Sequence, residues 1–292
     1  MSPVFRFAPS PNGYLHLGHA YSALLNAEFA RRLGGRFLVR IEDIDVTRCK
    51  PELVDAALED LAWLGLQWEG PVLRQSAHFQ RYRAVAVDLE AKGLLYPCFC
   101  TRGDLAKLAG EYPARDPDGA PLYPGICRHL EPGERARRIA AGVPHALRLD
   151  RAKAVKEVEA RPAASSAALS WDEVSGERLE ITVRLEADPL RWGDVVIVRK
   201  ECPTSYHLSV VLDDALQGVT HVVRGTDLYE ATTIHRLLQT LLDLPAPVYH
   251  HHELVKDDAG RKLAKSAASK PLRELRAEGV SAADIRKRFG FS

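Results

Sequence analysis

The first ninety residues alternate between short apolar segments and amphipathic ones, and this alternation restricts the chain to a small group of folds. Residues 4–8 and 36–41 are short and rich in β-forming residues. Apolar residues recur at helical spacing over residues 17–33 and 51–65, and a third helix is expected over 77–92. Strands that alternate with helices form a parallel sheet covered by helices on both faces. We therefore predict an α/β fold with a doubly wound parallel sheet.

The alternation is interrupted over residues 96–190. This segment holds three of the five cysteines, a run rich in proline, aspartate and glycine at 111–124, and a low-complexity stretch at 161–169. We interpret it as an α+β insertion that carries a cysteine cluster and has weaker structure than the rest of the chain.

Beyond the insertion the alternation resumes. Strands are expected at residues 194–199 and 219–223, and helices at 206–214 and 230–242. We predict one domain split between residues 1–95 and 191–266, a connective insertion at 96–190, and a basic helical tail at 267–292.

Charge is unevenly distributed along the chain. The 292 residues sum to +1, but residues 261–292 carry nine basic and three acidic residues, a net charge of +6. Such a tail is either a solvated helical face or a surface for nucleic-acid phosphates.

The composition also bears on the compartment. No stretch approaches the roughly 20 apolar residues of a membrane span, and Arg6 and Pro9 lie where the apolar core of an export signal would be. The odd number of cysteines favours reduced thiols over a disulfide scaffold. We expect a cytoplasmic protein with no membrane contact.

The segment from Pro9 to His19 links the first expected strand to the first expected helix. Ligands of doubly wound sheets bind beyond the carboxyl ends of the strands, and a helix N-terminus offers N–H groups to phosphate. His16 and His19 are three residues apart, so both can face a phosphate, and Gly18 lets a nucleotide approach the backbone. Two unrelated surface histidines are the alternative.

A second motif contains Lys262, Lys265 and Ser266. Two lysines on a loop can neutralise the charge that develops on a leaving pyrophosphate. Taken alone, the motif could equally be an exposed basic loop.

Together the two motifs look like the signature sequences of class I aminoacyl-tRNA synthetases, and the chain resembles their glutamyl branch. Further matching segments follow in order at residues 6–11, 40–45, 206–214 and 221–227. The resemblance covers residues 4–100 and 190–266. It implies a Rossmann-type catalytic domain and ATP-dependent activation of L-glutamate.

The resemblance also implies a glutamate pocket. Its residues would be Arg6, Ala8, Ser10, Glu42, Tyr206 and Arg224. The chemistry agrees, because two arginines can pair the two carboxylates of glutamate, one carboxylate can pair its ammonium group, and two hydroxyls add hydrogen bonds. Which arginine pairs which carboxylate is left open. From the residues alone, a surface ion pair and a core tyrosine would be the simpler interpretation.

For ATP, the resemblance implies binding at Pro9 and Gly18. The catalytic residues would be His16, His19, Lys262 and Lys265, with Lys265 also bound to ATP. The glutamate α-carboxylate would attack the α-phosphorus, so positioning and charge stabilisation replace a side-chain nucleophile. Mg²⁺ is expected with ATP, although the sequence contains no dedicated cage for it.

Two positions depart from the family pattern. Ala264 stands at the third position of the K-M-S-K-S signature, so a hydroxyl contact there is lost. The run before Tyr123 is longer than the usual spacer, which affects the geometry of the insertion.

The chain ends 26 residues after Ser266, where a full glutamyl-tRNA synthetase continues with an anticodon-binding domain. The expected absence of that domain is similar to the glutamyl-Q tRNA(Asp) synthetases, paralogues that place glutamate on the queuosine base of an anticodon. We expect tRNA(Asp) bearing queuosine as the partner of a monomer. The alternatives are a truncated synthetase that charges the tRNA 3′ end, a non-catalytic tRNA-binding regulator, and an unrelated nucleotidyltransferase.

The clustered cysteines suggest a metal site. Cys98, Cys100 and Cys127 supply three thiolates, and structural zinc takes four ligands. On general grounds His129 would be the fourth, because three cysteines and one histidine are a common set. The family resemblance instead implies Tyr123, which we follow, and one structural Zn²⁺ per chain. Three reduced cysteines without metal are the alternative.

Overall fold

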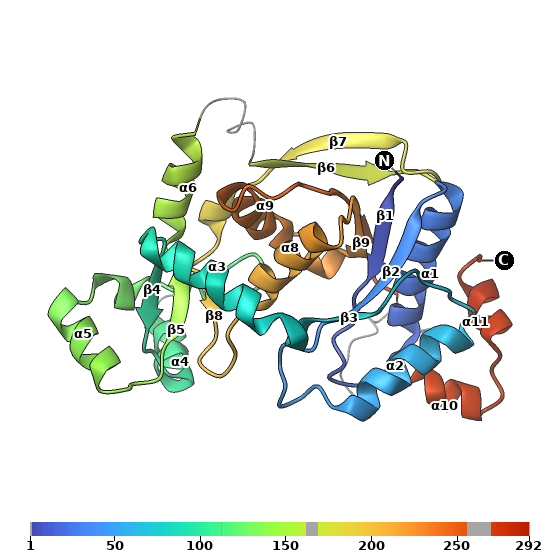
Figure 1. Cartoon of the computed structure of the whole chain (residues 1–292), viewed down its shortest axis with the longest axis horizontal. Coiled ribbons are helices and arrows are strands. Elements are labelled where there is room, and N and C mark those ends of the chain that lie inside the picture. The colour runs from blue at the N-terminus through green and yellow to red at the C-terminus, as the bar shows by residue number, and fades with distance from the viewer. Residues whose placement is uncertain (1, 112, 162–168, 256–269, 292) are drawn as a thin grey trace.

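Two β-sheets organise the protein (Figure 1). The computed structural model describes residues 2–111, 113–161, 169–255 and 270–291. The larger sheet has seven strands in the order β3-β2-β1-β9-β10-β6-β7, and the smaller has three in the order β4-β5-β8. The strands are β1 (Val4–Phe7), β2 (Arg36–Ile41), β3 (Leu73–Arg74), β4 (Leu95–Cys98), β5 (Ala146–Leu149), β6 (Ser170–Ser175), β7 (Ile181–Glu186), β8 (Val196–Val198), β9 (His221–Gly225) and β10 (Val248–His252).

Helices alternate with the strands of the larger sheet. The α-helices are α1 (Leu17–Arg32), α2 (Pro51–Trp63), α3 (Phe79–Ala91), α4 (Arg102–Glu111), α5 (Pro132–Ala140), α6 (Arg151–Glu159), α8 (Tyr206–Leu216), α9 (Ala231–Leu241), α10 (Leu272–Ala277) and α11 (Ala282–Arg288). Short 3₁₀ helices are η1 (Gln75–His78), η2 (Ile126–His129), η3 (Pro189–Arg191) and η4 (Thr226–Leu228).

The predicted doubly wound parallel sheet is confirmed. Strands β3, β2, β1, β9 and β10 pair in parallel throughout. Strand β1 lies between β2 and β9, so the connections after these three strands leave from the same edge. Ligands of such sheets bind at that edge, next to the point where the strand order reverses.

Sheet membership differs from the prediction in two places. Strand β8, expected to continue the main alternation, pairs antiparallel with β5 in the smaller sheet. Strands β6 and β7, which lie within the predicted insertion but were not predicted as strands, form a hairpin that joins the larger sheet through β10. Strand pairing is non-local, so a short apolar run such as β8 does not reveal its neighbours.

The expectation of a weakly structured insertion is wrong for its described residues. The smaller sheet, with α4 and η2, encloses its own buried cluster around Tyr96, Phe99 and Tyr123. The predicted boundaries at residues 95 and 190 stay predictions, but they do not coincide with the limits of the two sheets.

The two faces of β1 have different roles. Phe5 and Phe7 pack into the apolar cluster that includes α1 and α2. Side chains of a strand alternate between faces, so Arg6 points to the opposite side, where it contacts Asp214 of α8. One face of this strand therefore forms core, and the other presents a buried charge.

The described part of the basic tail packs against helices of the larger sheet. Leu272 and Ile285 are buried in the cluster that contains Phe5, and burying such a side chain contributes about 1.5–3 kcal/mol. Arg276 pairs with Glu59 of α2 at 2.9 Å. Among the described residues, no helix has the length and apolar character needed to span a bilayer.

Candidate active site

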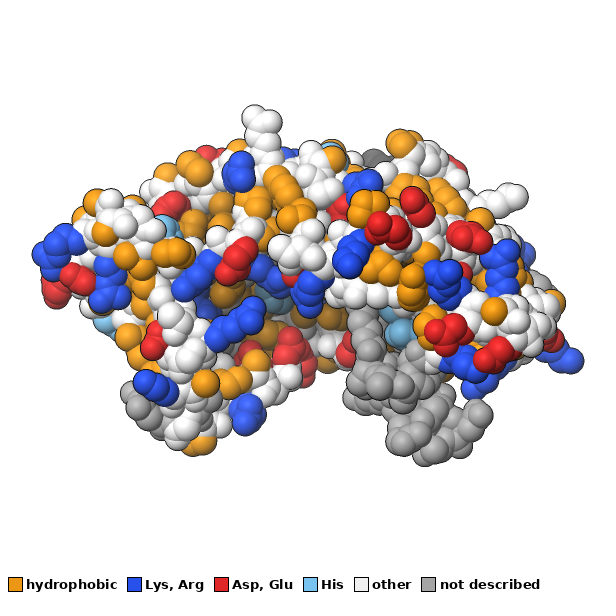
Figure 2. Space-filling view, turned by 90° about the horizontal axis from the view of Figure 1, so that it is seen from below, with side chains coloured by type: hydrophobic (Ala, Val, Ile, Leu, Met, Phe, Trp, Pro, Cys, Tyr) orange, Lys and Arg blue, Asp and Glu red, His pale blue; other side chains and the backbone are white. Residues whose placement is uncertain are grey.

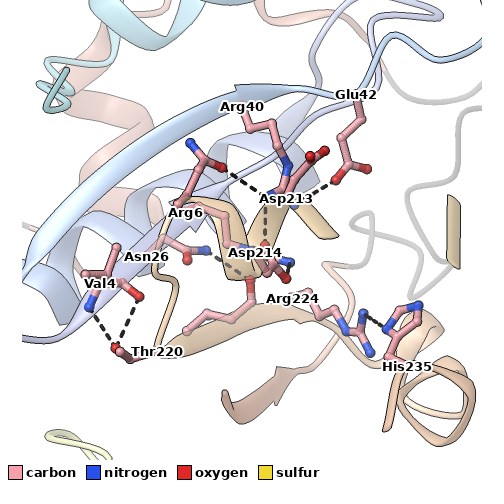
Figure 3. Close-up of polar contacts among 12 residues, drawn as sticks. Val4, Arg6, Asn26, Arg40, Glu42, Asp213, Asp214, Thr220, Arg224 and His235 are labelled. Carbon is pink, nitrogen blue, oxygen red and sulfur yellow. Dashed lines mark hydrogen bonds and ion pairs between the residues drawn. The ribbon is translucent and has the colours of Figure 1, made fainter. Parts of the chain in front are cut away.

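A chain of buried ion pairs lies beside the carboxyl ends of β1 and β2 (Figure 3). Arg6 Nε donates to Asp214 Oδ1 at 3.0 Å, and Arg40 Nη1 donates to the same oxygen at 2.7 Å. Arg40 Nη2 donates to Glu42 Oε1 at 3.0 Å. We call Arg6, Arg40, Glu42 and Asp214 the arginine–carboxylate cluster. Two guanidinium groups and two carboxylates balance one another there away from water.

Burial and pairing act in opposite directions on these groups. Burial raises the pKa of Glu42 above its usual value, although Arg40 and Arg6 pull it down. For Asp214 burial also acts upward, but Arg6 and Arg40 outweigh it and lower its pKa. Burial acts to lower the pKa of Arg40, yet the carboxylates of Asp214 and Glu42 raise it. Both arginines stay charged, because arginine does not lose its proton in proteins.

Arg224, near the end of β9, lies in a cage of acceptors. Its Nε donates to His251 Nε2 at 3.1 Å, and Nη1 donates to the hydroxyl of Tyr206 at 3.3 Å. The ring of His235, the carbonyl of Leu228 and the hydroxyl of Thr232 accept the others, at 3.2, 3.0 and 2.7 Å. These five contacts match the five N–H groups of a guanidinium.

Two histidines hold Arg224 as acceptors, which fixes their tautomers. His251 Nε2 accepts from Arg224, so its proton is on Nδ1, which lies 2.9 Å from a carboxylate oxygen of Glu173. His235 accepts through Nδ1, so its Nε2–H faces His207 Nδ1 at 3.3 Å. Burial, and then the charge of Arg224, lower the pKa of His207 to about 4. The same causes, in the same order, hold the pKa of His235 well below its usual value.

Tyr206 lies close both to Arg224 and to the arginine–carboxylate cluster. It is half-buried, and it accepts a hydrogen bond from Arg224. Burial raises its pKa, while the nearby charges of Arg224 and Arg6 lower it and that of Glu42 raises it. The structure therefore brings four predicted pocket residues into one region.

The remaining predicted pocket residues follow β1 directly. Ala8 and Ser10 are half-buried, and the intervening Pro9 accepts a backbone hydrogen bond from Glu42 N at 2.9 Å. Burial raises the pKa of Cys49, and a hydrogen bond with Ser10 opposes this shift. The turn after β1 is thus fastened to the end of β2.

The two motif histidines meet at the start of α1. His16 is the N-cap and accepts from Gly18 N through Nδ1 at 3.1 Å, and His19 Nδ1 accepts from His16 N at 3.2 Å. In the neutral rings, the proton is then on Nε2 of each. A Cβ at position 18 would lie 3.1 Å from the His16 ring, so glycine permits this close approach. His16 therefore caps the helix, and its ring lies beside that of His19, with the two ring centroids 3.9 Å apart.

The second motif, with Lys262 and Lys265, lies outside the described residues. The chain that follows it returns to the first motif. Leu272 N donates to Leu15 O at 2.8 Å, and Pro271 forms an isolated bridge with His16. The backbone therefore joins the start of the tail to the histidine turn.

The predicted metal ligands converge in the smaller sheet. The sulfur atoms of Cys98, Cys100 and Cys127 lie within 4.8 Å of one another. The hydroxyl of Tyr123 is 3.4 Å from Cys98 Sγ and 3.7 Å from Cys100 Sγ. We call these four residues the thiol–phenol cluster. His129 is exposed and is not part of it.

Electrostatics of this cluster favour one sulfur anion, that of Cys98. A hydrogen bond from Cys127 lowers the pKa of Cys98, and the donated proton raises the pKa of Cys127. Arg148 places its guanidinium carbon 3.9 Å from the Tyr123 ring centroid. The three cysteines supply three of the four donors of a structural zinc site, and the phenol oxygen of Tyr123 lies next to them.

Several residues that build the active site were not predicted. Arg40 and Asp214 were within recognised motifs but were given no role, because a motif does not reveal which charges pair. Glu173, His235 and His251 carried no signal, since their contacts depend on strands and helices far apart in the sequence.

The fold and these side chains define the catalytic domain of a class I aminoacyl-tRNA synthetase. A family model described as tRNA synthetases class I (E and Q), catalytic domain, matches residues 4–285, and the chain belongs to this family.

Within this family, the chain is similar to proteins of the glutamyl branch. A protein named glutamyl-Q tRNA(Asp) synthetase from Rhodobacter capsulatus is 48% identical over 98% of this chain and 99% of its own length. Glutamate–tRNA ligase 2 from Nitrosococcus oceani is 40% identical over 94% of this chain and 56% of its own length. The solved glutamate-tRNA synthetase of Elizabethkingia anophelis superimposes with a TM-score of 0.70 at 25% identity, over 96% of this chain and 54% of that one.

Proposed function

We propose that this protein uses ATP to activate L-glutamate as glutamyl-adenylate and transfers the glutamate to the queuosine base in the anticodon of tRNA(Asp). The single observation that carries the proposal is the meeting of Arg6, Glu42, Tyr206 and Arg224 beyond the strand ends. Glutamate has two anionic groups and one cationic group, and this region supplies fixed charges opposite to each.

The hydrogen bonds sharpen the roles of the two arginines. Arg224 has five N–H groups and five acceptors among the described residues. Arg6 donates two hydrogen bonds, both to Asp214. Arg6 is thus the better candidate for a direct, two-point contact with a carboxylate. Arg224 would act through its charge and through Tyr206, whose O–H can donate to the substrate while its oxygen accepts from Arg224.

Activation needs placement more than side-chain chemistry. The α-carboxylate of glutamate attacks the α-phosphorus of ATP, pyrophosphate leaves, and a hydroxyl of the acceptor then attacks the adenylate carbonyl and releases AMP. We assign phosphate contacts to His16, His19 and the start of α1, and stabilisation of the leaving pyrophosphate to Lys262 and Lys265. Pro9 and Gly18 would border the nucleotide. Mg²⁺ bound with ATP would neutralise phosphate charge.

The acceptor is proposed from the relatives. Three of the most similar sequences, at 48%, 41% and 41% identity, are named glutamyl-Q tRNA(Asp) synthetase. The basic tail supports a tRNA partner through its charge. A cytoplasmic location and a monomeric state stay predictions from the sequence.

Labelled glutamate, ATP and tRNA(Asp) with or without queuosine would test the transfer. After nuclease digestion, the label is expected on the anticodon fragment of the queuosine-bearing tRNA. Label on the 3′-terminal adenosine of both tRNAs would overturn the proposed acceptor and favour a synthetase that charges the 3′ end.

We also propose that the thiol–phenol cluster binds one structural Zn²⁺, with Tyr123 as its fourth ligand. The support is the convergence of one phenol oxygen and three sulfur atoms, together with the exposed position of His129. Elemental analysis should give one zinc per chain for the protein and for H129A, and a weaker zinc affinity for Y123F. Zinc binding that is weakened by H129A and unaffected by Y123F would reverse the assignment.

A further inference from the structure

A cavity of about 920 Å³ lies between the end of β2 and the smaller sheet. Its lining comes from residues 44–48, from the end of β4 and the start of α4, and from β5, β8 and the residues that follow β8. Cys98, Cys100 and Cys202 are on this lining. Because the first two belong to the thiol–phenol cluster, the cavity borders that cluster, and its volume is typical of small-molecule sites.

The cavity is cationic. Its lining holds five basic and two acidic residues, a net charge of +3. Arg48 pairs with Asp45 at 2.7 Å, and Lys200 Nζ donates to the carbonyl oxygen of Cys100 at 3.0 Å. The other charged residues of the lining are Arg102, Arg148, Arg199 and Glu201. A cleft lined by one sign of charge raises the local concentration of ions of the opposite sign, so this cavity favours an anion beside Cys100.

Cys100 and Cys127 form a close pair of thiols with different access. Cys100 is half-buried and is the most exposed cysteine of the cluster, whereas Cys98 and Cys127 are 2% and 4% exposed. The sulfur atoms of Cys100 and Cys127 are 3.6 Å apart, and a disulfide bond needs about 2.05 Å, so a short approach would join them. An accessible thiol beside a second thiol that can resolve it is typical of redox-active cysteine pairs.

We infer that Cys100 and Cys127 are a thiol–disulfide exchange site for an anionic low-molecular-weight disulfide such as glutathione disulfide. The sulfur of Cys100 attacks one sulfur of this reagent and breaks its S–S bond. One half leaves as a thiol with the proton of Cys100, and the other half stays bound to Cys100. The sulfur of Cys127 then attacks Cys100, and the second half leaves as a thiol with the proton of Cys127. The two cysteines are oxidised to one disulfide, and the reagent is reduced to two thiols.

This exchange does not depend on the proposed glutamate transfer, but it bears on the metal proposed for the cluster. A disulfide between Cys100 and Cys127 leaves Cys98 and Tyr123 as the remaining donors of the cluster. Structural zinc takes four ligands. Oxidation should therefore lower the zinc affinity of the protein, and reduction should restore it.

Peptide mapping tests the pair directly. The full chain, with and without prior treatment with a chelator, is incubated with glutathione disulfide, digested without reduction and analysed by mass spectrometry. The expected product is a peptide pair linked through Cys100 and Cys127, with two molecules of glutathione released per chain. No such cross-link under either condition, or a cross-link that joins Cys98 to Cys127 instead, would overturn the inference. Because the wild-type protein gives this result by itself, it does not depend on whether a cysteine variant folds.

Two serine variants separate the roles of the cysteines. C127S lacks the resolving thiol and should keep one glutathione on Cys100. C202S is the matched control, because Cys202 is on the same lining but donates to the carbonyl of Ile44 at 3.0 Å and is not part of the cluster. It should form the cross-link as the wild-type protein does. Release of the glutathione from C127S through a cross-link to Cys98 would contradict the role of Cys127.

Reagents of opposite charge test the cationic lining. R102Q/R199Q should slow cross-linking by glutathione disulfide at least about threefold and should not slow cross-linking by cystamine, a cationic disulfide. R31Q/R36Q is the control, since it removes two arginines that are not on the lining, and it should leave both rates unchanged. Equal slowing of both reagents by R102Q/R199Q would overturn the preference for an anion.

Discussion

The arginine–carboxylate cluster and the thiol–phenol cluster are both buried and polar, but they are balanced differently. In the first, two cations of the protein face two anions of the protein, and each side chain orients its neighbour. In the second, three sulfur atoms and one phenol oxygen face one another. The arginine–carboxylate cluster, beside the larger sheet, is therefore held in place by its own residues. The insertion instead carries a donor set that suits a metal ion.

Because of this difference, different changes should destabilise the two clusters. A self-balanced cluster is damaged by removing one partner, because an unpaired charge then stays buried. A metal-centred cluster is damaged by removing the ion, because the bonds from its ligands to the metal are then lost. Figure 2 shows a face of the molecule on which Lys and Arg side chains lie among Asp and Glu side chains, so a surface charge that loses its partner has water and other charges nearby, which a buried charge lacks.

The largest expected effect is that of D214N. The substitution leaves Arg6 and Arg40 buried without their shared anion, which typically costs about 3–5 kcal/mol. The free energy of unfolding from urea titration should fall by that amount. E28Q is the matched control, since Glu28 also accepts from two arginines, but these arginines are 71% and 35% exposed, and solvent-exposed ion pairs contribute about 1 kcal/mol or less. Similar losses in the two variants would break the comparison.

Lowering the pH should reduce the free energy of unfolding through protonation of His207. Its pKa is about 4 in the folded protein, against an ordinary value of 6.5. The unfolded chain therefore binds more protons between these values, so stability falls as the pH drops from 6.5 to 4, by at most about 3 kcal/mol from this residue. H207Q should lose less stability over the same window. Parallel pH curves for the two proteins would show that His207 does not carry this dependence.

Removing the zinc ion that we propose for the thiol–phenol cluster should act locally on the insertion. In the chelator-treated protein, amide hydrogen exchange at β4 and η2 should accelerate about 100-fold, because the proposed ion would join these segments. This acceleration corresponds to about 2.7 kcal/mol of local stability. Exchange at β1 and β9 should change far less. Equal acceleration in both regions would mean that the two clusters are not independent.

The smallest of these effects is that of E173Q on glutamate binding. The carboxylate of Glu173 holds the proton of His251 on Nδ1, which leaves Nε2 to accept from Arg224. Loss of this control should raise the KM for glutamate about tenfold, or about 1.4 kcal/mol, with a smaller change in kcat. The neighbouring D172N, whose side chain pairs with Arg184 instead, should have little effect. A kcat loss without a KM change would rule out a positioning role.

The sequence predicted three strands of the larger sheet, β1, β2 and β9, and the helices beside them, because helical and strand periodicity are local properties. Residues 4–8, 17–33 and 36–41 became the expected elements within one or two residues. It did not predict that β6 and β7 join the larger sheet, or that β8 leaves it, because pairing across long separations has no local signal.

In the candidate active site, too, local motifs were predicted and long-range contacts were not. A family resemblance pointed to Arg6, Glu42, Tyr206 and Arg224, and the structure brings them together. Their partners escaped prediction, since Asp214 contacts Arg6 across 208 positions of the chain. Only the folded arrangement reveals that a carboxylate with no predicted role balances two buried arginines.

ATP–pyrophosphate exchange measured with glutamate, glutamine and aspartate, in the absence and presence of tRNA, tests the central claim most directly. The buried charges beyond β1, β2 and β9 predict exchange with glutamate, strongly reduced exchange with the other two, and loss of the glutamate-dependent signal in E42A in a protein that remains folded. Equal exchange with glutamine, or no exchange with any of the three under either condition, would contradict a glutamate-activating site.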